Sequence, residues 1–363
     1  MLISQLQDQI KSAAARGAKL EIRGHGSKAF YGQTPSGELL EMSGYSGISS
    51  YEPSELVVTV KAGTPIVELE QLLAQQGQRL AFEPPRFGGR GTFGGTVGGM
   101  VAAGLSGPAR ACMGALREHV LGVTLLNGNA EAMSFGGTVI KNVAGYDVSR
   151  LMAGSMGILG LLLEVSLKVL PAPKAQATLR FELGQEQALN QLNRWGGQPL
   201  PIDASAWWDD ALLLRLCGAR AAVHSACQTL GGELIEAELA APFWTGLRDH
   251  SDEYFLGAAR AVEGGAKLWR LSLPQTAPAL NLHGEQLIEW GGAQRWVATP
   301  MAANMVRELA AKAGGHATLF RAADKSGGVF TPLAAPLMRI HRQLKHSFDP
   351  QGIFNPGRLY DEL

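Results

Sequence analysis

Clustered glycines constrain this chain more than any other feature of its sequence. Nine of them fall within the 24 residues 84–107, and the whole chain of 363 residues has 46. The spacing is not periodic, which excludes collagen. A flexible linker is one reading of residues 84–107, but Val97, Met100, Val101 and Leu105 recur as the apolar face of a short helix. Clustered glycines therefore predict backbone that approaches a ligand closely.

A second glycine motif follows a predicted strand near the start of the chain. Residues 22–28 read Ile-Arg-Gly-His-Gly-Ser-Lys, and no acidic residue occurs from position 22 to 37. Two glycines allow successive N–H groups to converge on an anion, so the motif predicts a phosphate cradle. The spacing also matches a Rossmann fingerprint, which requires a helix directly afterwards. Residues 31–37 are rich in helix breakers instead, and an ordinary tight loop remains an alternative.

Two further motifs complete the series. Residues 136–147 end in Lys-Asn-Val-Ala-Gly-Tyr-Asp, and residues 154–160 read Gly-Ser-Met-Gly-Ile-Leu-Gly. The last motif, at 349–358, is Asp-Pro-Gln-Gly-Ile-Phe-Asn-Pro-Gly-Arg. Each of these motifs alone could be turn chemistry.

Hydrophobic patterning predicts an α+β chain with two domains. Residues 1–170 lack tryptophan, whereas all seven tryptophans follow residue 190, and two prolines at 170–174 indicate a seam. For the first part we predict helices at 3–16, 64–76 and 146–153, with Thr64 capping the second, and strands at 19–23, 56–61 and 120–126.

For the second part we predict an antiparallel sheet with helices on one face. The expected strands are 177–183, 211–216, 267–273 and 294–298, and the expected helices are 186–195, 219–230 and 302–313. A last helix, at 333–347, precedes the final glycine motif. The tryptophans are expected in the core, although an exposed subset could mark a partner surface.

Composition excludes several classes of protein. Lys+Arg and Asp+Glu both number 32, which argues against a general nucleic-acid binder or a polybasic membrane anchor. No apolar run is long enough to span a bilayer, so we expect a cytoplasmic protein. The cysteines, Cys112, Cys217 and Cys227, are too few for a four-cysteine iron–sulfur cluster, and no histidine or cysteine group has metal-ligand spacing. No metal site is expected.

In this order and spacing, the motifs resemble the vanillyl-alcohol-oxidase or PCMH-type FAD-binding family. The resemblance rests on Arg-Gly-x-Gly-Ser at 23–27, Thr-x-Gly-Gly-x-x-Ala at 96–102, and the motifs at 141–147, 154–160 and 349–357. It implies a two-subdomain FAD-binding domain at 1–172, a cap or partner domain at 173–332, and a C-terminal segment, 333–363, that returns to the flavin.

The resemblance also implies one non-covalent FAD and assigns its contacts. In the family, the first loop binds the FAD diphosphate, the central glycine segment lies along the ribityl chain and flavin, and the C-terminal Asn lies near the ring. The expected FAD-binding residues in this sequence are Arg23, Gly24, His25, Gly26, Ser27, Lys28, Pro84, Gly95, Thr96, Gly98, Gly99, Ala102, Ser106, Gly107, Gly154, Gly157, Ile158, Gly160 and Asn355.

Within the family, the chain is most similar to the FAD-binding subunits of bacterial complexes that oxidise glycolate to glyoxylate. That similarity implies an oxidoreductase subunit that acts with a homologous FAD-binding catalytic subunit and an iron–sulfur subunit. The complex could attach the chain peripherally to the inner face of the cytoplasmic membrane. Two alternatives remain open: a stand-alone flavin enzyme for another small 2-hydroxy acid, and a structural assembly subunit.

Catalytic members of this branch carry a His-x-Gly-x-Gly-Asn-x-His stretch and a later Glu-His-Gly, and this sequence has neither. The resemblance therefore implies an auxiliary or electron-relaying role. For contacts with a substrate carboxylate the sequence offers Lys141, Arg295 and Arg321, with Arg270 and Lys325 as further cations. Ordinary ion pairs are the alternative for each of these residues.

Overall fold

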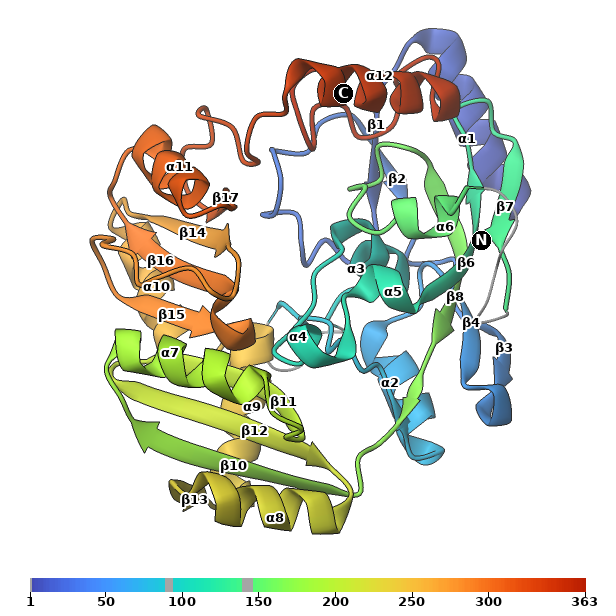
Figure 1. Cartoon of the computed structure of the whole chain (residues 1–363). Helices are drawn as coiled ribbons and strands as arrows, with labels where there is room; N and C mark the ends of the chain where they lie inside the picture. The colour runs from blue at the N-terminus through green and yellow to red at the C-terminus, as the bar shows by residue number, and fades with distance from the viewer. Residues whose placement is uncertain (1, 89–93, 139–145) are drawn as a thin grey trace. The chain divides into compact units, whose positions relative to one another are not determined.

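A computed structural model describes residues 2–88, 94–138 and 146–363, which form two compact units (Figure 1). The first unit comprises Met1–Leu105, Ala115–Ala172 and Pro332–Leu363, and the second comprises Ser106–Gly114 and Pro173–Thr331. The segment Ser106–Gly114 lies within the predicted 1–172 domain but packs with the second unit. The predicted α+β class is confirmed, with helices and antiparallel sheets in both units.

A five-stranded antiparallel sheet forms the centre of the first unit, in the order β3-β4-β8-β6-β7. Its central strand, β8 (Leu161–Lys168), is buried on both faces, which explains its nearly unbroken apolar sequence. The other strands are β3 (Ile48–Glu52), β4 (Val57–Lys61), β6 (Val120–Leu126) and β7 (Ala132–Gly136). Two small pairs accompany the sheet: parallel β1 (Leu20–Arg23) with β2 (Glu38–Glu41), and β5 (Gln78–Arg79) with β9 (Leu170–Pro171).

Helices of the first unit pack their apolar faces into the same core as this sheet. The first, α1 (Ile3–Arg16), buries Leu6, Ile10 and Ala13 and ends at Gly17, whose φ of 66° is left-handed. The remaining helices of the unit are α2 (Ile66–Gln75), α3 (Val97–Ala103), α5 (Leu116–His119), α6 (Val148–Leu151), α12 (Ala335–Phe348) and the 3₁₀ turn η1 (Pro53–Glu55).

The predicted cap of the second helix is wrong. Pro65, and not Thr64, is the N-cap of α2, and no side chain caps this helix. The Thr64 hydroxyl instead accepts a hydrogen bond from the N–H of Gly47 at 2.9 Å and donates to the Gly47 carbonyl at 3.1 Å. The Thr64 hydroxyl is hydrogen-bonded to a residue 17 positions away in sequence, so it does not cap the helix.

An eight-stranded antiparallel sheet forms the second unit, in the order β13-β10-β12-β11-β15-β16-β14-β17. Its strands are β10 (Ala175–Glu182), β11 (Ile202–Trp208), β12 (Ala211–Gly218), β13 (Glu233–Ile235), β14 (Lys267–Ser272), β15 (Gln286–Glu289), β16 (Gln294–Thr299) and β17 (His316–Arg321).

Helices lie on both faces of this sheet, so the expectation of helices on one face is wrong. Figure 1 shows α7 (Gln185–Gly196) and α8 (Arg220–Leu230) along one face, where their apolar residues pack with Leu179. The neighbouring residue Thr178 points to the other face and accepts a hydrogen bond from Trp244 of α9 (Ala237–Asp249) at 3.0 Å. The other helices are α4 (Arg110–Met113), α10 (Glu253–Glu263), α11 (Ala303–Lys312) and the turn η2 (Trp290–Gly292).

Six of the seven tryptophans are buried in the second unit, and Trp208 is half-buried. Trp290 donates to the carbonyl of Gly107 at 3.0 Å, and its ring packs under the Arg110 guanidinium. The tryptophans therefore belong to the core of the second unit, and Trp290 connects the Ser106–Gly114 segment to the sheet.

The end of the chain returns to the first unit. Leu20 of β1 donates its N–H to Ile353 at 2.7 Å and accepts from the N–H of Asn355 at 2.9 Å. The buried side chains of Phe348, Ile353 and Phe354 join the core of the first unit. The last glycine motif therefore lies beside the strand that leads into the first one.

Candidate functional site

A pocket with a cavity volume of about 120 Å³ lies within the first unit. Four segments that are far apart in sequence supply most of its lining: residues 21–29, helix α3 with its N-cap, residues 156–162, and the C-terminal residues Asn355 and Arg358. Three glycine motifs and the final motif therefore meet at one place.

The first loop leaves β1 in a tight turn. Gly24 lies against Thr96, so close that an added Cβ atom would fall 2.3 Å from the threonine hydroxyl oxygen. Gly26 has a φ of 69°, in the left-handed region that favours glycine. The N–H groups of Ala29 and Tyr31 donate to the carbonyls of Gly26 and Lys28, each at 3.0 Å. These bonds give the loop its curvature.

Positive charge dominates this end of the pocket. Arg23, Lys28 and Arg358 line it, and Glu21 is the one carboxylate among the lining residues that the structure describes. Glu21 pairs with Arg23 at 2.6 Å. Burial lowers the pKa of Arg358 to about 10, partly opposed by Glu21, so its guanidinium stays charged at neutral pH. An anionic ligand group is the natural complement of this arrangement.

Helix α3 supplies the second wall. Thr96 is its N-cap, and the Thr96 hydroxyl accepts from the N–H of Gly99 at 3.2 Å. Gly98, Gly99 and Ala102 line the pocket, and glycine and alanine add little side-chain bulk to this wall.

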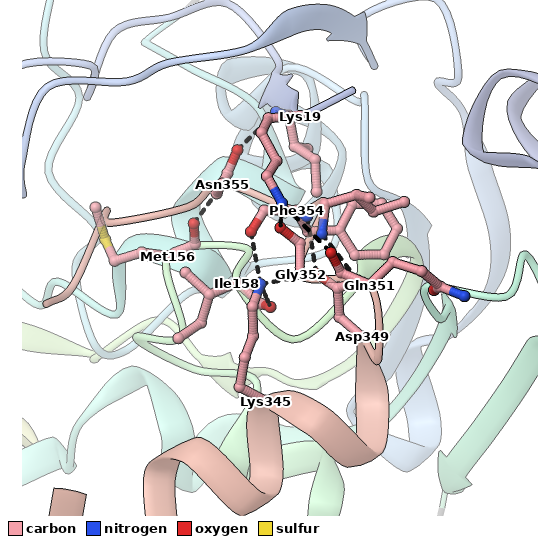
Figure 2. A network of polar contacts seen from close by, with 11 residues as sticks. Lys19, Met156, Ile158, Lys345, Asp349, Gln351, Gly352, Phe354 and Asn355 are labelled. Carbon is pink, nitrogen blue, oxygen red and sulfur yellow. Dashed lines mark hydrogen bonds and ion pairs between the residues drawn. The ribbon is translucent and has the colours of Figure 1, made fainter. Parts of the chain in front are cut away.

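Asn355 ties the remaining two walls together. Its side-chain oxygen accepts from the N–H of Ile22 at 2.8 Å, and its amide nitrogen donates to the carbonyl of Met156 at 2.7 Å. Figure 2 shows the contact with Met156. One side chain thus fixes the strand before the first loop to the loop at 154–160.

Most of the residues expected from the resemblance line this pocket. They are Arg23, Gly24, His25, Gly26, Ser27, Lys28, Thr96, Gly98, Gly99, Ala102, Gly157, Gly160 and Asn355.

Six expected residues do not line it: Pro84, Gly95, Ser106, Gly107, Gly154 and Ile158. Ser106 and Gly107 pack with the second unit, and the carbonyl of Ile158 accepts from Lys345 at 2.8 Å. Gly95 accepts from the N–H of Ile66 through its carbonyl, at 3.0 Å.

The structure adds pocket residues that sequence reasoning missed. They are Glu21, Ile22, Ala29, Pro35, Met42, Ala62, Ala103, Met156, Leu161, Leu162 and Arg358. Arg358 carried a signal, because it directly follows the final Asn-Pro-Gly. The apolar members carried none, since core and pocket walls use the same residue types.

Of the candidate substrate contacts, the two that the structure describes, Arg295 and Arg321, do not line this pocket. Lys141 is outside the described residues. Arg295 is fully buried in the second unit, and its guanidinium donates to the carbonyls of Ala277, Pro278 and Gly292. These hydrogen bonds give Arg295 a structural role. Arg321 ends β17 and is half-buried, and burial lowers its pKa.

Across residues 2–88, 94–138 and 146–363, histidine, cysteine and acidic side chains form no group of three that could hold a metal ion. Within the same ranges, none of the helices combines the length and the apolar character needed to cross a membrane.

The pocket residues fit FAD. The first loop and its cations Arg23 and Lys28 suit the diphosphate, because the N–H groups of a glycine-rich turn can converge on an anion. The apolar side chains of Ile22, Met42 and Leu161 suit a flat ring system.

Comparisons with known proteins agree with this reading of the pocket. Residues 3–136 match a family model described as an FAD binding domain. The chain is 46% identical to the glycolate oxidase subunit GlcE of Escherichia coli K12, over 99% of this chain and 97% of that protein. It is 33% identical to a D-lactate dehydrogenase of Anaerostipes hadrus, over 39% of this chain and 29% of that protein. It is 29% identical to the glycolate oxidase subunit GlcD of Bacillus subtilis, over 43% of this chain and 33% of that protein.

Among solved structures, an alkyldihydroxyacetonephosphate synthase superposes with a TM-score of 0.65. It shares 13% identity, and the match covers 97% of this chain and 75% of that one, so it supports the fold alone. The near full-length identity to GlcE, together with the family model, shows that this chain belongs to the FAD-binding family that includes the glycolate oxidase subunit GlcE.

Proposed function

We propose that this chain is the FAD-binding subunit of a complex that oxidises glycolate to glyoxylate. The observation that carries the proposal is the 46% identity to GlcE along 99% of the chain. Two relatives, GlcE and GlcD, are named as different subunits of glycolate oxidase, which supports a multi-subunit enzyme. Bound FAD would supply a carrier that accepts two electrons.

The residues of the chain would hold that cofactor in place. The curved first loop and its cations Arg23 and Lys28 would bind the diphosphate, and Asn355 would keep the surrounding walls at a fixed spacing. We infer non-covalent attachment, because Ser27 occupies the end of the loop, where some related flavoproteins carry a histidine that bonds to the flavin.

An auxiliary or electron-relaying role accounts for what the sequence lacks. The chain has no His-x-Gly-x-Gly-Asn-x-His stretch and no Glu-His-Gly, and its three cysteines cannot hold a four-cysteine cluster. We infer that a homologous FAD-binding subunit removes the hydride from glycolate and that an iron–sulfur subunit carries the electrons onward. Such a complex would work in the cytoplasm, at the inner face of the membrane.

Four measurements, three on the purified chain and one on the co-expressed complex, test this proposal. A visible spectrum should show bound flavin, and acid precipitation should release it into the supernatant. Glycolate should not bleach the flavin of the isolated chain, whereas glycolate-dependent dye reduction should require co-expression with both partner subunits.

Each competing reading has its own outcome. Bleaching by glycolate at the rate of the whole complex would contradict the auxiliary role and favour a stand-alone enzyme. A colourless chain that still assembles with its partners would favour a structural subunit. Flavin that stays with the acid-denatured polypeptide would contradict non-covalent attachment.

A further inference from the structure

The carbonyl groups of the first loop converge on one side chain. The Arg358 guanidinium donates to the carbonyl of Tyr31 at 2.6 Å, to that of Ala29 at 3.3 Å, and to that of Gln33. Arg358 is only 6% exposed, and its main-chain carbonyl accepts from the N–H of Gln33 at 3.1 Å. Alternate residues of the loop are therefore bound by a single cation.

These contacts extend to the part of the loop that lines the pocket. Ala29 and Tyr31, whose carbonyls bind Arg358, use their N–H groups to engage the carbonyls of Gly26 and Lys28. A carbonyl oxygen facing an anion would repel it. Because the carbonyls of Gly26 and Lys28 are engaged inside the loop, the residues from Gly24 to Lys28 present a surface suited to an anion.

The loop is built to approach Arg358 closely. Gly32 has a φ of 82°, and a Cβ atom there would lie 2.9 Å from the Arg358 carbonyl oxygen and 3.6 Å from its guanidinium carbon. Only glycine allows this approach without strain.

The segment that carries Arg358 is anchored at its base. The buried Lys345 ammonium donates to Asp349, to the carbonyl of Ile158 and to that of Phe354, each at 2.8 Å (Figure 2). Asp349 in turn accepts from the N–H groups of Ile353 and Phe354. The C-terminal segment is thus held firmly before it reaches the loop.

We propose that Arg358 is a positioning residue that sets the conformation of the loop from Gly24 to Gln33, and through it the affinity for a diphosphate ligand. This inference rests on the proposed function, since FAD supplies the diphosphate. It goes beyond that function by assigning loop geometry to a residue of the C-terminal segment.

The test compares two ligands on the FAD-depleted full chain. Arg358→Met should raise the Kd for FAD about 30-fold, the loss expected when a charged donor to several carbonyls is removed. The Kd for riboflavin, which has no phosphate, should stay within about threefold on the same reasoning. Arg339→Met is the matched control, because it removes a positive charge from an exposed position on α12 and should leave both Kd values unchanged.

A second variant separates positioning from charge. Arg358→Lys keeps the charge but cannot reach three carbonyls in the same fork geometry. We expect it to recover little of the FAD affinity and to leave amide hydrogen exchange faster across residues 26–33 of the FAD-depleted chain, with β4 unaffected.

The possible outcomes distinguish the inference from the function on which it rests. If the unaltered chain binds no FAD, the proposed function fails and the inference with it. If the unaltered chain binds FAD, full recovery by Arg358→Lys, an unchanged FAD Kd in Arg358→Met, or equal losses for FAD and riboflavin would each overturn the inference alone.

Discussion

Gly24 has less room for a side chain than Gly26, although they belong to the same loop. A Cβ atom on Gly24 would lie 2.3 Å from the Thr96 hydroxyl oxygen and 2.7 Å from the Thr96 methyl carbon. A Cβ atom on Gly26 would meet nothing closer than 3.6 Å, so Gly26 is restricted only by its φ. The first glycine fixes the distance between the loop and α3, and the second fixes the turn.

Gly24→Ala should therefore weaken FAD binding. The added methyl group must push the loop from α3, and we expect the Kd for FAD to rise at least about tenfold, the effect of displacing a ligand-binding loop by a fraction of an ångström. Fluorescence titration of the FAD-depleted chain measures this. Gly137→Ala, where a Cβ atom would meet nothing within 4 Å, should leave the Kd unchanged. Equal Kd values in the two variants would refute the tight contact.

Single residues were predictable where a local rule decides their role. The first loop could be predicted from residues 22–28, because glycine, cations and a preceding strand are adjacent in sequence. Arg295 could not be assigned, since its carbonyl partners lie at 277, 278 and 292 and come together only in the fold. The role of Thr64 could not be predicted either, because its hydroxyl is hydrogen-bonded to Gly47 in another segment.

At the scale of elements, α10 begins at an unusually basic carboxylate. Asp252 caps the helix by accepting from the N–H of Phe255 at 2.9 Å. Burial raises the pKa of Asp252 to about 6, opposed by the cap bond and assisted by Glu253. The folded chain therefore binds the Asp252 proton more tightly than the unfolded chain, in which the pKa is 3.8. Protonated Asp252 therefore stabilises the folded chain. This contribution to the free energy of unfolding is complete below pH 3.8 and is lost as the pH rises through about 6.

Asp252→Asn should remove this pH dependence, because asparagine caps a helix as well and carries no charge. We expect the variant to gain about 1–2 kcal/mol of unfolding free energy over the parent at pH 7.5, and nothing at pH 4, after allowing for the partial exposure of the side chain. Urea unfolding at the two pH values measures the difference. A constant difference between parent and variant would contradict this reading.

Helix α12 depends on a buried ion pair. Lys345 and Asp349 are 7% and 1% exposed, and their side chains meet at 2.8 Å. Lys345→Met leaves the Asp349 carboxylate buried without its cation, so we expect a loss of about 3–5 kcal/mol in unfolding free energy. Lys345→Met combined with Asp349→Asn should recover part of this loss.

The control for this ion pair is Lys19→Met. Lys19 is exposed and donates to two carbonyls in the same network, at 2.8 and 3.3 Å (Figure 2). Its removal should cost less than about 0.5 kcal/mol. If the Lys19 and Lys345 variants were equally stable, the buried pair would not anchor the segment.

Element prediction succeeded where the apolar period is strong and failed where breakers interrupt it. Helix α1 lies within the predicted bounds, and β6 likewise. Helix α9 was not predicted, and it contains Pro242 and Gly246, which count locally against a helix. Its burial of Trp244 and Leu247 against the sheet supplies the missing stability, and tertiary packing of this kind is invisible to a local rule.

At the scale of the whole molecule, strand order could not be predicted. The central strand of the first sheet, β8, lies between β4 and β6, about 100 and 40 residues earlier in the chain. The second sheet inserts β15 and β16 between β11 and β14. Such pairings depend on contacts over long sequence separations. The packing of Ser106–Gly114 with the second unit could not be predicted for the same reason. It depends on the hydrogen bond from Trp290 to Gly107, which are 183 residues apart in sequence.

The segregation of the seven tryptophans has a practical consequence for optical studies. All of them belong to the second unit, whereas the FAD pocket belongs to the first. Tryptophan fluorescence therefore reports the unfolding of the second unit. The fluorescence of flavin released on heating reports the unfolding of the first unit. Because a ligand stabilises only the unit that binds it, excess FAD should delay the flavin transition on heating and leave the indole transition in place. An indole transition that moves with FAD concentration would mean that both units melt as one cooperative block.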